Sequence, residues 1–162
     1  LDVVQGDYPI IRIMPNTPVL LGKGMIQYCH QNVNNTQLST WLKAMALCGV
    51  LDEVSEKDMD AASSVSGCGP AFVYAFIEAL ADGGVACGLP RQKAMTYAAQ
   101  MVFGSASMVL ETGKHPGQLK DEVCSPGGST IQGVRTLEEH GFRGAVMASV
   151  IAAYEKSRDL GK

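Results

Sequence analysis

The stretch 66-SGCGPAFVYAFIEALADGGVACGLPR-91 decides the fold of this chain. Residues 70–87 are apolar on nearly all sides, and Glu78 and Asp82 are the main polar residues among them. An apolar run of this length predicts a helix, and one without a polar face predicts a central, buried helix. Residues 88–90, Gly-Leu-Pro, end it because glycine and proline interrupt helices. The stretch therefore predicts a mainly helical protein.

Most of the chain after this stretch also has the pattern of helices. Residues 91–112 form a second long segment, in which small side chains recur and would let another helix approach closely. Two further helices are predicted over 129–139 and 143–160, separated by Gly141. We expect these segments to form one helical domain of roughly 100 residues.

The residues before this helical part alternate between strand and helix patterns. Short apolar runs bounded by turns predict strands over 8–14, 24–28 and 50–54. Residues 36–47 carry apolar side chains at i, i+3, i+4 and i+7, which predicts an amphipathic helix between the second and third strands. This order indicates an α/β element.

The change of pattern places a domain boundary near Ser55. We predict that residues 1–54 are the end of an α/β domain and that residues 55–162 are a helical domain. The chain opens on Leu1, without an initiating Met, and runs almost at once into a strand pattern. We therefore expect it to be a piece of a longer polypeptide.

Composition and charge exclude several classes of function. With 46% hydrophobic residues and a mean hydropathy of +0.08, the chain has more apolar surface than it can bury alone, which indicates an oligomer. A net charge of −3 without a basic block argues against a nucleic-acid partner. The spacing of the five cysteines and three histidines argues against a disulfide framework or a metal site. No leader sequence or charge-free apolar run of about 18 residues is present, so we expect a cytoplasmic protein without a membrane partner.

The stretch 125-SPGGST-130 is the main candidate for chemistry. Its two glycines remove the Cβ atoms that would keep a ligand from the backbone, and the helix that follows presents unpaired N–H groups at its start. Such an arrangement binds a carboxylate, which the positive end of the helix dipole also favours. The alternative is an ordinary turn in which Ser or Thr caps a helix. The candidate substrate-binding residues are Ser125, Gly127, Gly128, Ser129 and Thr130.

Three segments carry a resemblance to a known family. The run 119-LKDEVCSPGGSTIQGVRTLE-138 resembles the signature region of pyrroline-5-carboxylate reductases, the enzymes that make proline. The opening stretch, 66–91, resembles their central helix. The run 12-RIMPNTP-18 resembles the segment after a late strand of their cofactor domain. The resemblance covers essentially the whole chain, in order.

The resemblance implies a fold and an assembly. Members of the family have an amino-terminal Rossmann domain for NADPH or NADH, followed by a helical domain that dimerises by interlocking with its twin. Residues 1–54 would then be the end of a Rossmann-type domain, and the protein a homodimer or a larger homo-oligomer. No G-x-G-x-x-G follows an amino-terminal strand, so the cofactor would bind mainly outside this chain, and we expect the chain alone to be inactive.

The resemblance also implies a reaction and a role for the candidate residues. The family reduces 1-pyrroline-5-carboxylate to L-proline by hydride transfer to the C=N carbon. The residue matching Thr130 hydrogen-bonds the ring nitrogen and is the catalytic candidate, while backbone amides at Ser129 and Thr130 hold the carboxylate. We also predict Asn16 as a cofactor-binding residue near the nicotinamide of the complete enzyme, the alternative being that Pro15-Asn16 only forms a turn. Glu122 stands where some relatives carry Asn near the cofactor, and an acid there would repel phosphate.

Two other functions remain open from the sequence. One is a reductase of related two-domain design that acts on another small cyclic imino acid or keto acid. The other, from a different class, is a helical oligomerisation module with an incidental anion site. Binding of proline that depends on Thr130 would favour a reductase, whereas dimerisation without such binding would favour the module.

Overall fold

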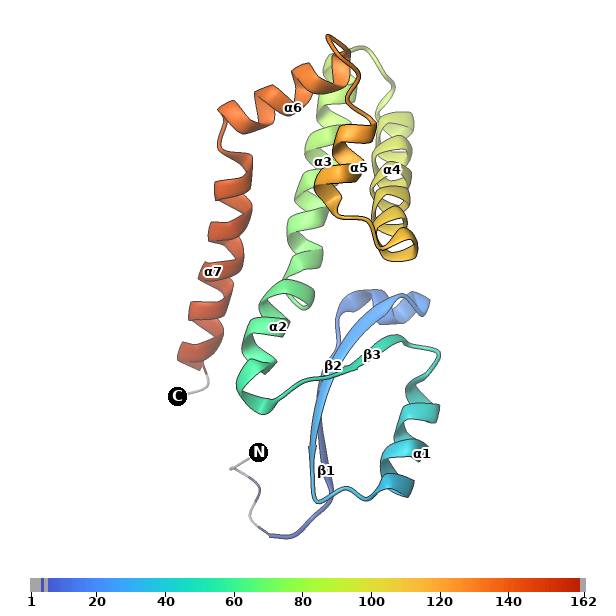
Figure 1. Cartoon of the computed structure of the whole chain (residues 1–162), viewed down its shortest axis with the longest axis vertical. Helices are drawn as coiled ribbons and strands as arrows, with labels where there is room; N and C mark the ends of the chain where they lie inside the picture. The colour runs from blue at the N-terminus through green and yellow to red at the C-terminus, as the bar shows by residue number, and fades with distance from the viewer. Residues whose placement is uncertain (1–3, 5, 161–162) are drawn as a thin grey trace. The chain divides into compact units, whose positions relative to one another are not determined.

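We describe residues 4 and 6–160 of a computed structural model of the chain (Figure 1). Two compact units divide the chain. The sheet unit comprises the residues up to Ala71 together with those from Ala148, and the helical unit comprises Phe72–Met147. The prediction of a mainly helical chain with a small α/β part at its amino-terminal end is confirmed.

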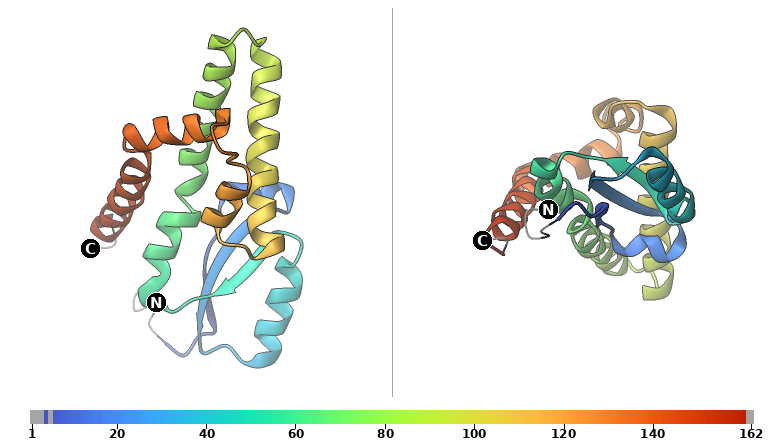
Figure 2. Two further views of the ribbon diagram at one scale, coloured as in Figure 1. Left: turned by 45° about the horizontal axis from the view of Figure 1, so that its top comes forward. Right: turned by 90° about the horizontal axis from the view of Figure 1, so that it is seen from below.

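The sheet unit is built on three strands, β1 (Ile10–Met14), β2 (Gly24–Gln31) and β3 (Gly49–Glu53), in that order across the sheet. The first pair is antiparallel and joined by the short 3-10 helix η1 (Thr17–Leu21), while the second pair is parallel. A parallel pair needs a crossover, which α1 (Asn35–Met45) supplies (Figure 2). All three predicted strands and the predicted helix are therefore present.

The core of the sheet unit follows the central strand. Ile26, Tyr28 and Cys29 of β2 are buried, and the Tyr28 ring lies 4.9 Å from that of Trp41 on α1. Met59, the first residue of α2 (Met59–Ser66), is also fully buried. Strand β2 runs three residues beyond the predicted end because residues 29–31 pair with residues 10–12 of β1.

The helical unit contains a small core between two long helices, α3 (Gly69–Ala86) and α4 (Arg91–Thr112). Ala81, Ala94 and Ala98 are buried where these helices meet. A Cβ on Gly84 would lie only 3.2 Å from the Ala94 side chain, so small residues set this close approach. The chain continues through α5 (Pro116–Glu122), α6 (Ser129–Glu139) and α7 (Phe142–Leu160), with rings of Phe76 and Phe142 5.8 Å apart.

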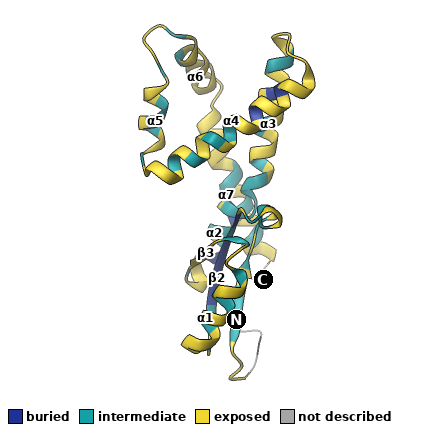
Figure 3. Ribbon diagram, turned by 90° about the vertical axis from the view of Figure 1, so that its right-hand side faces the viewer, coloured by how far each residue is buried: buried dark blue, intermediate teal, exposed yellow. Residues whose placement is uncertain are grey.

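The prediction that residues 70–87 form a buried helix is wrong for the single chain. The helix exists as α3, but of its residues only Ala81 is buried (Figure 3). Large apolar side chains stay exposed because the chain supplies too little surface to cover them. By length and composition alone, the segment Glu56–Ala86 would also suffice to cross a membrane, a property that core helices of soluble proteins share.

A polar cluster in the sheet unit contains the one cysteine that is buried among the described residues. The Cys29 thiol donates to Glu56 Oε2 at 2.9 Å, and Arg12 pairs with the same carboxylate. Burial first, and then the hydrogen bond to Glu56, raises the pKa of Cys29 from 9.0 to about 11. Because the folded state favours the protonated thiol, this contribution to stability is present below pH 9 and is lost as the pH rises through 11.

We expect Cys29 to react with iodoacetamide about tenfold more slowly at pH 8 than the exposed Cys87 does. A thiolate fraction lowered about 100-fold is partly offset by the greater nucleophilicity of a more basic thiolate. Mass spectrometry of the native protein after timed alkylation measures both rates. Equal rates would mean that neither burial nor the hydrogen bond to Glu56 holds the thiol protonated.

Candidate functional site

The 125–130 stretch forms a tight turn that leads directly into α6. The N–H of Gly128 donates to the carbonyl of Ser125 at 3.0 Å, which leaves Pro126 and Gly127 in the two central positions. Gly127 has a φ of +68°, a conformation that glycine adopts without steric cost. Proline followed by a glycine of positive φ is the pattern of a type II turn. The sequence thus fixes the point at which α6 begins.

The start of α6 carries no side-chain cap. Gly128 is the residue before the helix, and within the part of the chain that the structure describes no side chain accepts a bond from the first turn. Thr130 is the second helical residue, where it does not act as the cap. The alternative left open by the sequence, an ordinary Ser or Thr cap, is therefore not observed. The first N–H groups of α6 remain available to a ligand.

The surroundings of this helix start suit a small anion. A Cβ on residue 128 would lie 2.4 Å from Ser125 Oγ, so the glycine makes room for that hydroxyl beside the helix start. A Cβ on Gly127 would meet no described atom within 4 Å, so this side of the turn is open. Ser125, Ser129 and Thr130 are exposed. The Ser125 hydroxyl thus lies beside the start of α6, whose first N–H groups have no side-chain cap, and an anion is the kind of ligand that such a helix start favours.

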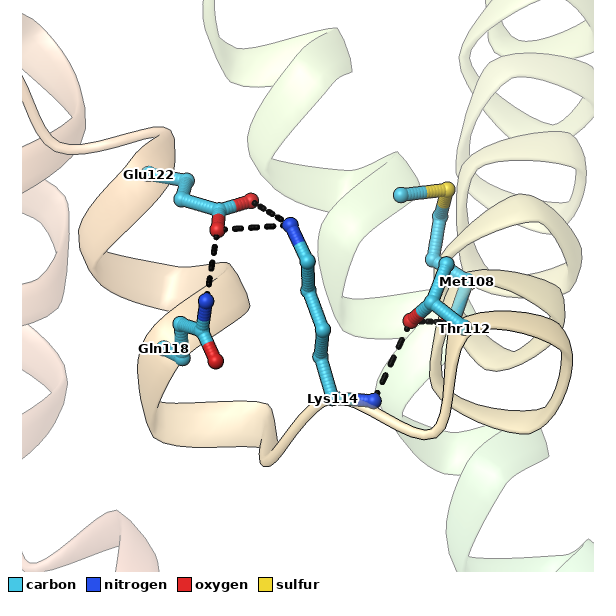
Figure 4. A network of polar contacts seen from close by, with 5 residues as sticks. All are labelled: Met108, Thr112, Lys114, Gln118 and Glu122. Carbon is cyan, nitrogen blue, oxygen red and sulfur yellow. Dashed lines mark hydrogen bonds and ion pairs between the residues drawn. The ribbon is translucent and has the colours of Figure 1, made fainter.

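Glu122, the last residue of α5, is engaged by two neighbours (Figure 4). Lys114 Nζ lies 2.8 and 3.1 Å from its two oxygens, and Gln118 Nε2 donates to Oε1 at 3.1 Å. The hydrogen bond from Lys114 is the main reason that the pKa of Glu122 is lowered. The carboxylate is therefore ionised and paired within the helical unit.

Asn16 belongs to the sheet unit and holds three of its parts together. Its Nδ2 donates to the carbonyl of Ser66 at the end of α2, and its Oδ1 accepts from the N–H of Met25 on β2, both at 3.0 Å. The Ser66 hydroxyl in turn donates to Gln27 at 2.8 Å. Both polar ends of the Asn16 amide are thus engaged. An approach of Asn16 to a cofactor stays a prediction.

Sequence reasoning missed helix α5 and the residues that hold it. The helix has few apolar residues, so periodicity gave no signal. His115 precedes it, and its Nδ1 accepts from the N–H of Gly117 at 3.0 Å. The Pro116 that opens the helix was a usable signal, since proline is favoured in a first turn. Across residues 4 and 6–160, no group of three His, Cys, Asp or Glu side chains is placed to hold a metal ion.

Comparison with known proteins gives consistent results for the sequence and the fold. A family model described as pyrroline-5-carboxylate reductase dimerisation matches residues 56–160. The pyrroline-5-carboxylate reductase of Synechocystis is 50% identical over 157 residues, covering 96% of this chain and 59% of the relative. That of Glycine max is 47% identical over 156 residues, covering 96% of this chain and 57% of the relative.

A solved structure of a relative has the same fold over nearly the whole of this chain. The crystal structure of Plasmodium falciparum pyrroline carboxylate reductase with NADP bound has a TM-score of 0.92 and 43% identity, and the match covers 99% of this chain and 65% of that one. The chain thus spans under two thirds of the length of each of these relatives. Since the family model matches more than half of its residues, this chain belongs to the pyrroline-5-carboxylate reductase dimerisation family.

Proposed function

We propose that the chain is the dimerisation and substrate-binding part of a pyrroline-5-carboxylate reductase, an oxidoreductase of proline biosynthesis. In this proposal residues 1–54 are the end of a Rossmann-type cofactor domain and residues 55–162 are the helical domain. The enzyme reduces 1-pyrroline-5-carboxylate to L-proline with NADPH or NADH. Its location is the cytoplasm.

The observation that carries the proposal is the uncapped start of α6. Ser125, Gly127 and Gly128 leave the first N–H groups of the helix open, and none of the described side chains occupies them. The substrate carries one carboxylate. The ring carbon that bears it is bonded directly to the nitrogen of the C=N group. Backbone N–H groups of Ser129 and Thr130 would hold the carboxylate, which fixes the ring and leaves the Thr130 hydroxyl for the nitrogen.

The reaction needs a donor at the ring nitrogen. When bound, NADPH or NADH would supply the hydride for the C=N carbon. The electron pair of the C=N bond then moves onto nitrogen, which takes a proton from solvent. The Thr130 hydroxyl donates a hydrogen bond to this atom, and so makes the carbon more electrophilic and stabilises the charge that develops on nitrogen. No residue of the chain needs to form a covalent bond.

The described residues fit the imino acid better than the cofactor. The Glu122 carboxylate is already engaged by Lys114 and Gln118, and the Asn16 amide already has partners at both ends. We therefore assign no contact with pyrophosphate to this chain. In the proposal the dinucleotide is held chiefly by the part of the relatives' length that this chain does not span.

The partner we propose is a second copy of the same chain. An apolar groove between α3 and α4 is lined by Gly84, Leu89 and Tyr97 among others, and many large apolar side chains of the two helices are exposed. A soluble protein that leaves so much apolar surface exposed in one chain covers it in an assembly. The match to a dimerisation family supports this occupant.

Charging the groove should weaken the dimer. Met101 lines it and is about half exposed in the single chain, so Met101→Glu should leave the fold of one chain intact. We expect the dissociation constant of the dimer to rise at least about tenfold, measured by sedimentation. The matched control is Gln100→Glu, which adds the same charge one residue away on α4, outside the groove. Equal effects of both variants would contradict a groove-specific contact.

The test of the function is a reductase assay on the product of the full open reading frame. We expect oxidation of NADPH or NADH that depends on 1-pyrroline-5-carboxylate and yields L-proline by chromatography. The matched control substrate is 1-pyrroline, which lacks the carboxylate and should have a much higher KM. No turnover of 1-pyrroline-5-carboxylate would refute this substrate. Turnover of a six-membered cyclic imino acid instead would favour the alternative reductase.

A further inference from the structure

Helix α5 has little to hold it in place except side-chain contacts. It has seven residues, fewer than an isolated helix needs to be stable in water. Yet its last residue lies two residues before Cys124 and three before Ser125, where the carboxylate-binding turn begins. Whatever fixes the end of α5 therefore fixes the approach to that turn.

Lys114 connects the end of α4 with the end of α5 (Figure 4). Its backbone N–H donates to Thr112 Oγ1 at 3.2 Å, and that hydroxyl donates to the carbonyl of Met108 at 2.5 Å. Its side chain runs along the whole of α5 and pairs with both oxygens of Glu122 at 2.8 and 3.1 Å. Gln118, one turn earlier on α5, donates to the same carboxylate.

The charges explain why this contact is needed. Glu122 is at the carboxy-terminal end of α5, where the helix dipole disfavours an anion. Asp121 adds a second negative charge there, which Lys120 pairs at 2.5 Å. Without Lys114, the Glu122 carboxylate would destabilise the last turn of a helix that is already short. With Lys114 present, the Glu122 carboxylate attaches the last turn of α5 to the residues that follow α4.

We propose that Lys114 is a positioning residue for substrate binding, which acts through Glu122 to hold the turn at 125–130 in place. The proposal rests on the proposed function, because the turn is taken as the carboxylate site. It gives Glu122 a role that requires no contact with the cofactor. It also predicts that the pair matters for the imino acid and not for NADPH.

The test is a charge-reversal cycle in the full-length protein. Lys114→Glu places two carboxylates together, and we expect the KM for 1-pyrroline-5-carboxylate to rise roughly fivefold, as expected for a half-exposed charge network. The KM for NADPH should not change, and neither should the midpoint of global thermal unfolding, because the loss of the pair loosens α5 only locally. The double variant Lys114→Glu with Glu122→Lys restores the pair and should recover most of the effect. Arg135→Met is the matched control, since it breaks a 2.8 Å ion pair within α6.

A second measurement does not depend on activity. Hydrogen–deuterium exchange of residues 123–131 should be faster in Lys114→Glu than in wild type, and normal again in the double variant. An unchanged KM, a lack of recovery, or a change in the KM for NADPH alone overturns the positioning role. If the wild-type protein does not reduce the imine, the proposed function fails, and exchange still decides whether Lys114 holds the turn.

Discussion

Gly49→Ala is expected to destabilise the sheet unit by more than about 4 kcal/mol, which is exceptional for a single substitution. Gly49 is the first residue of β3 and pairs in register with Gly24 of β2. A Cβ on Gly49 would lie 2.1 Å from the carbonyl oxygen of Gly24 and 2.4 Å from its nitrogen. These neighbours are backbone atoms, so no side chain can turn away. A φ of +138° adds strain for any residue with a Cβ.

The effect should appear as loss of the folded sheet at room temperature. Circular dichroism melts and the intrinsic fluorescence of Trp41, which packs on Tyr28, report on this unit. The matched control is Gly133→Ala in α6, where a Cβ meets no described atom within 4 Å and helix propensity favours alanine by roughly 0.5–1 kcal/mol. If Gly49→Ala were as stable as the control, the backbones of β2 and β3 would be able to move apart at this point without a loss of folding free energy.

The sequence could place Gly49 but could not give its reason. Periodicity predicts that the amphipathic helix ends near residue 47, and a glycine just beyond such an end has the pattern of a helix terminator. In the structure α1 ends at Met45 and its last residues need no glycine. What requires glycine is the close approach of Gly24, a contact 25 residues away in the chain. Such a contact leaves no mark in local patterns.

Elsewhere too, features set by local patterns were predicted and features set by contacts between distant residues were missed. Long helices and short strands have strong periods, so α3, α4, α6, α7 and the three strands were all found from the sequence. The exposure of α3 in the single chain was not predicted. Hydropathy indicates that an apolar face is covered, but it does not indicate whether the same chain or a second copy covers it. Lys114 and Glu122 are also a pair that helical periodicity could not predict, because Lys114 lies before α5 and only Glu122 belongs to the helix. The turn at 125–130 was predictable because proline and glycine act through local sterics.

Thr130→Ala is expected to lower kcat/KM for 1-pyrroline-5-carboxylate by about 10²- to 10³-fold, as loss of one hydrogen-bond donor to a transition state does. The loss should not come from unfolding. The hydroxyls of Thr96 and Thr136 donate to the carbonyl four residues earlier, whereas that of Thr130 has no such bond in the described chain. Alanine is also a better helix former than threonine, so α6 should be as stable or slightly more so.

Three variants separate the donor from other effects. Thr130→Ser keeps a hydroxyl at the same position and should retain most of the activity. Thr136→Ala removes a hydroxyl that serves only its own helix, and it should leave kcat/KM unchanged. Steady-state kinetics with circular dichroism on each protein give the comparison. If Thr130→Ala stays within tenfold of wild type while 1-pyrroline-5-carboxylate is still reduced, the ring nitrogen takes its hydrogen bond from another group. The backbone N–H groups at the start of α6 would then keep their carboxylate role alone, because a side-chain substitution leaves them in place.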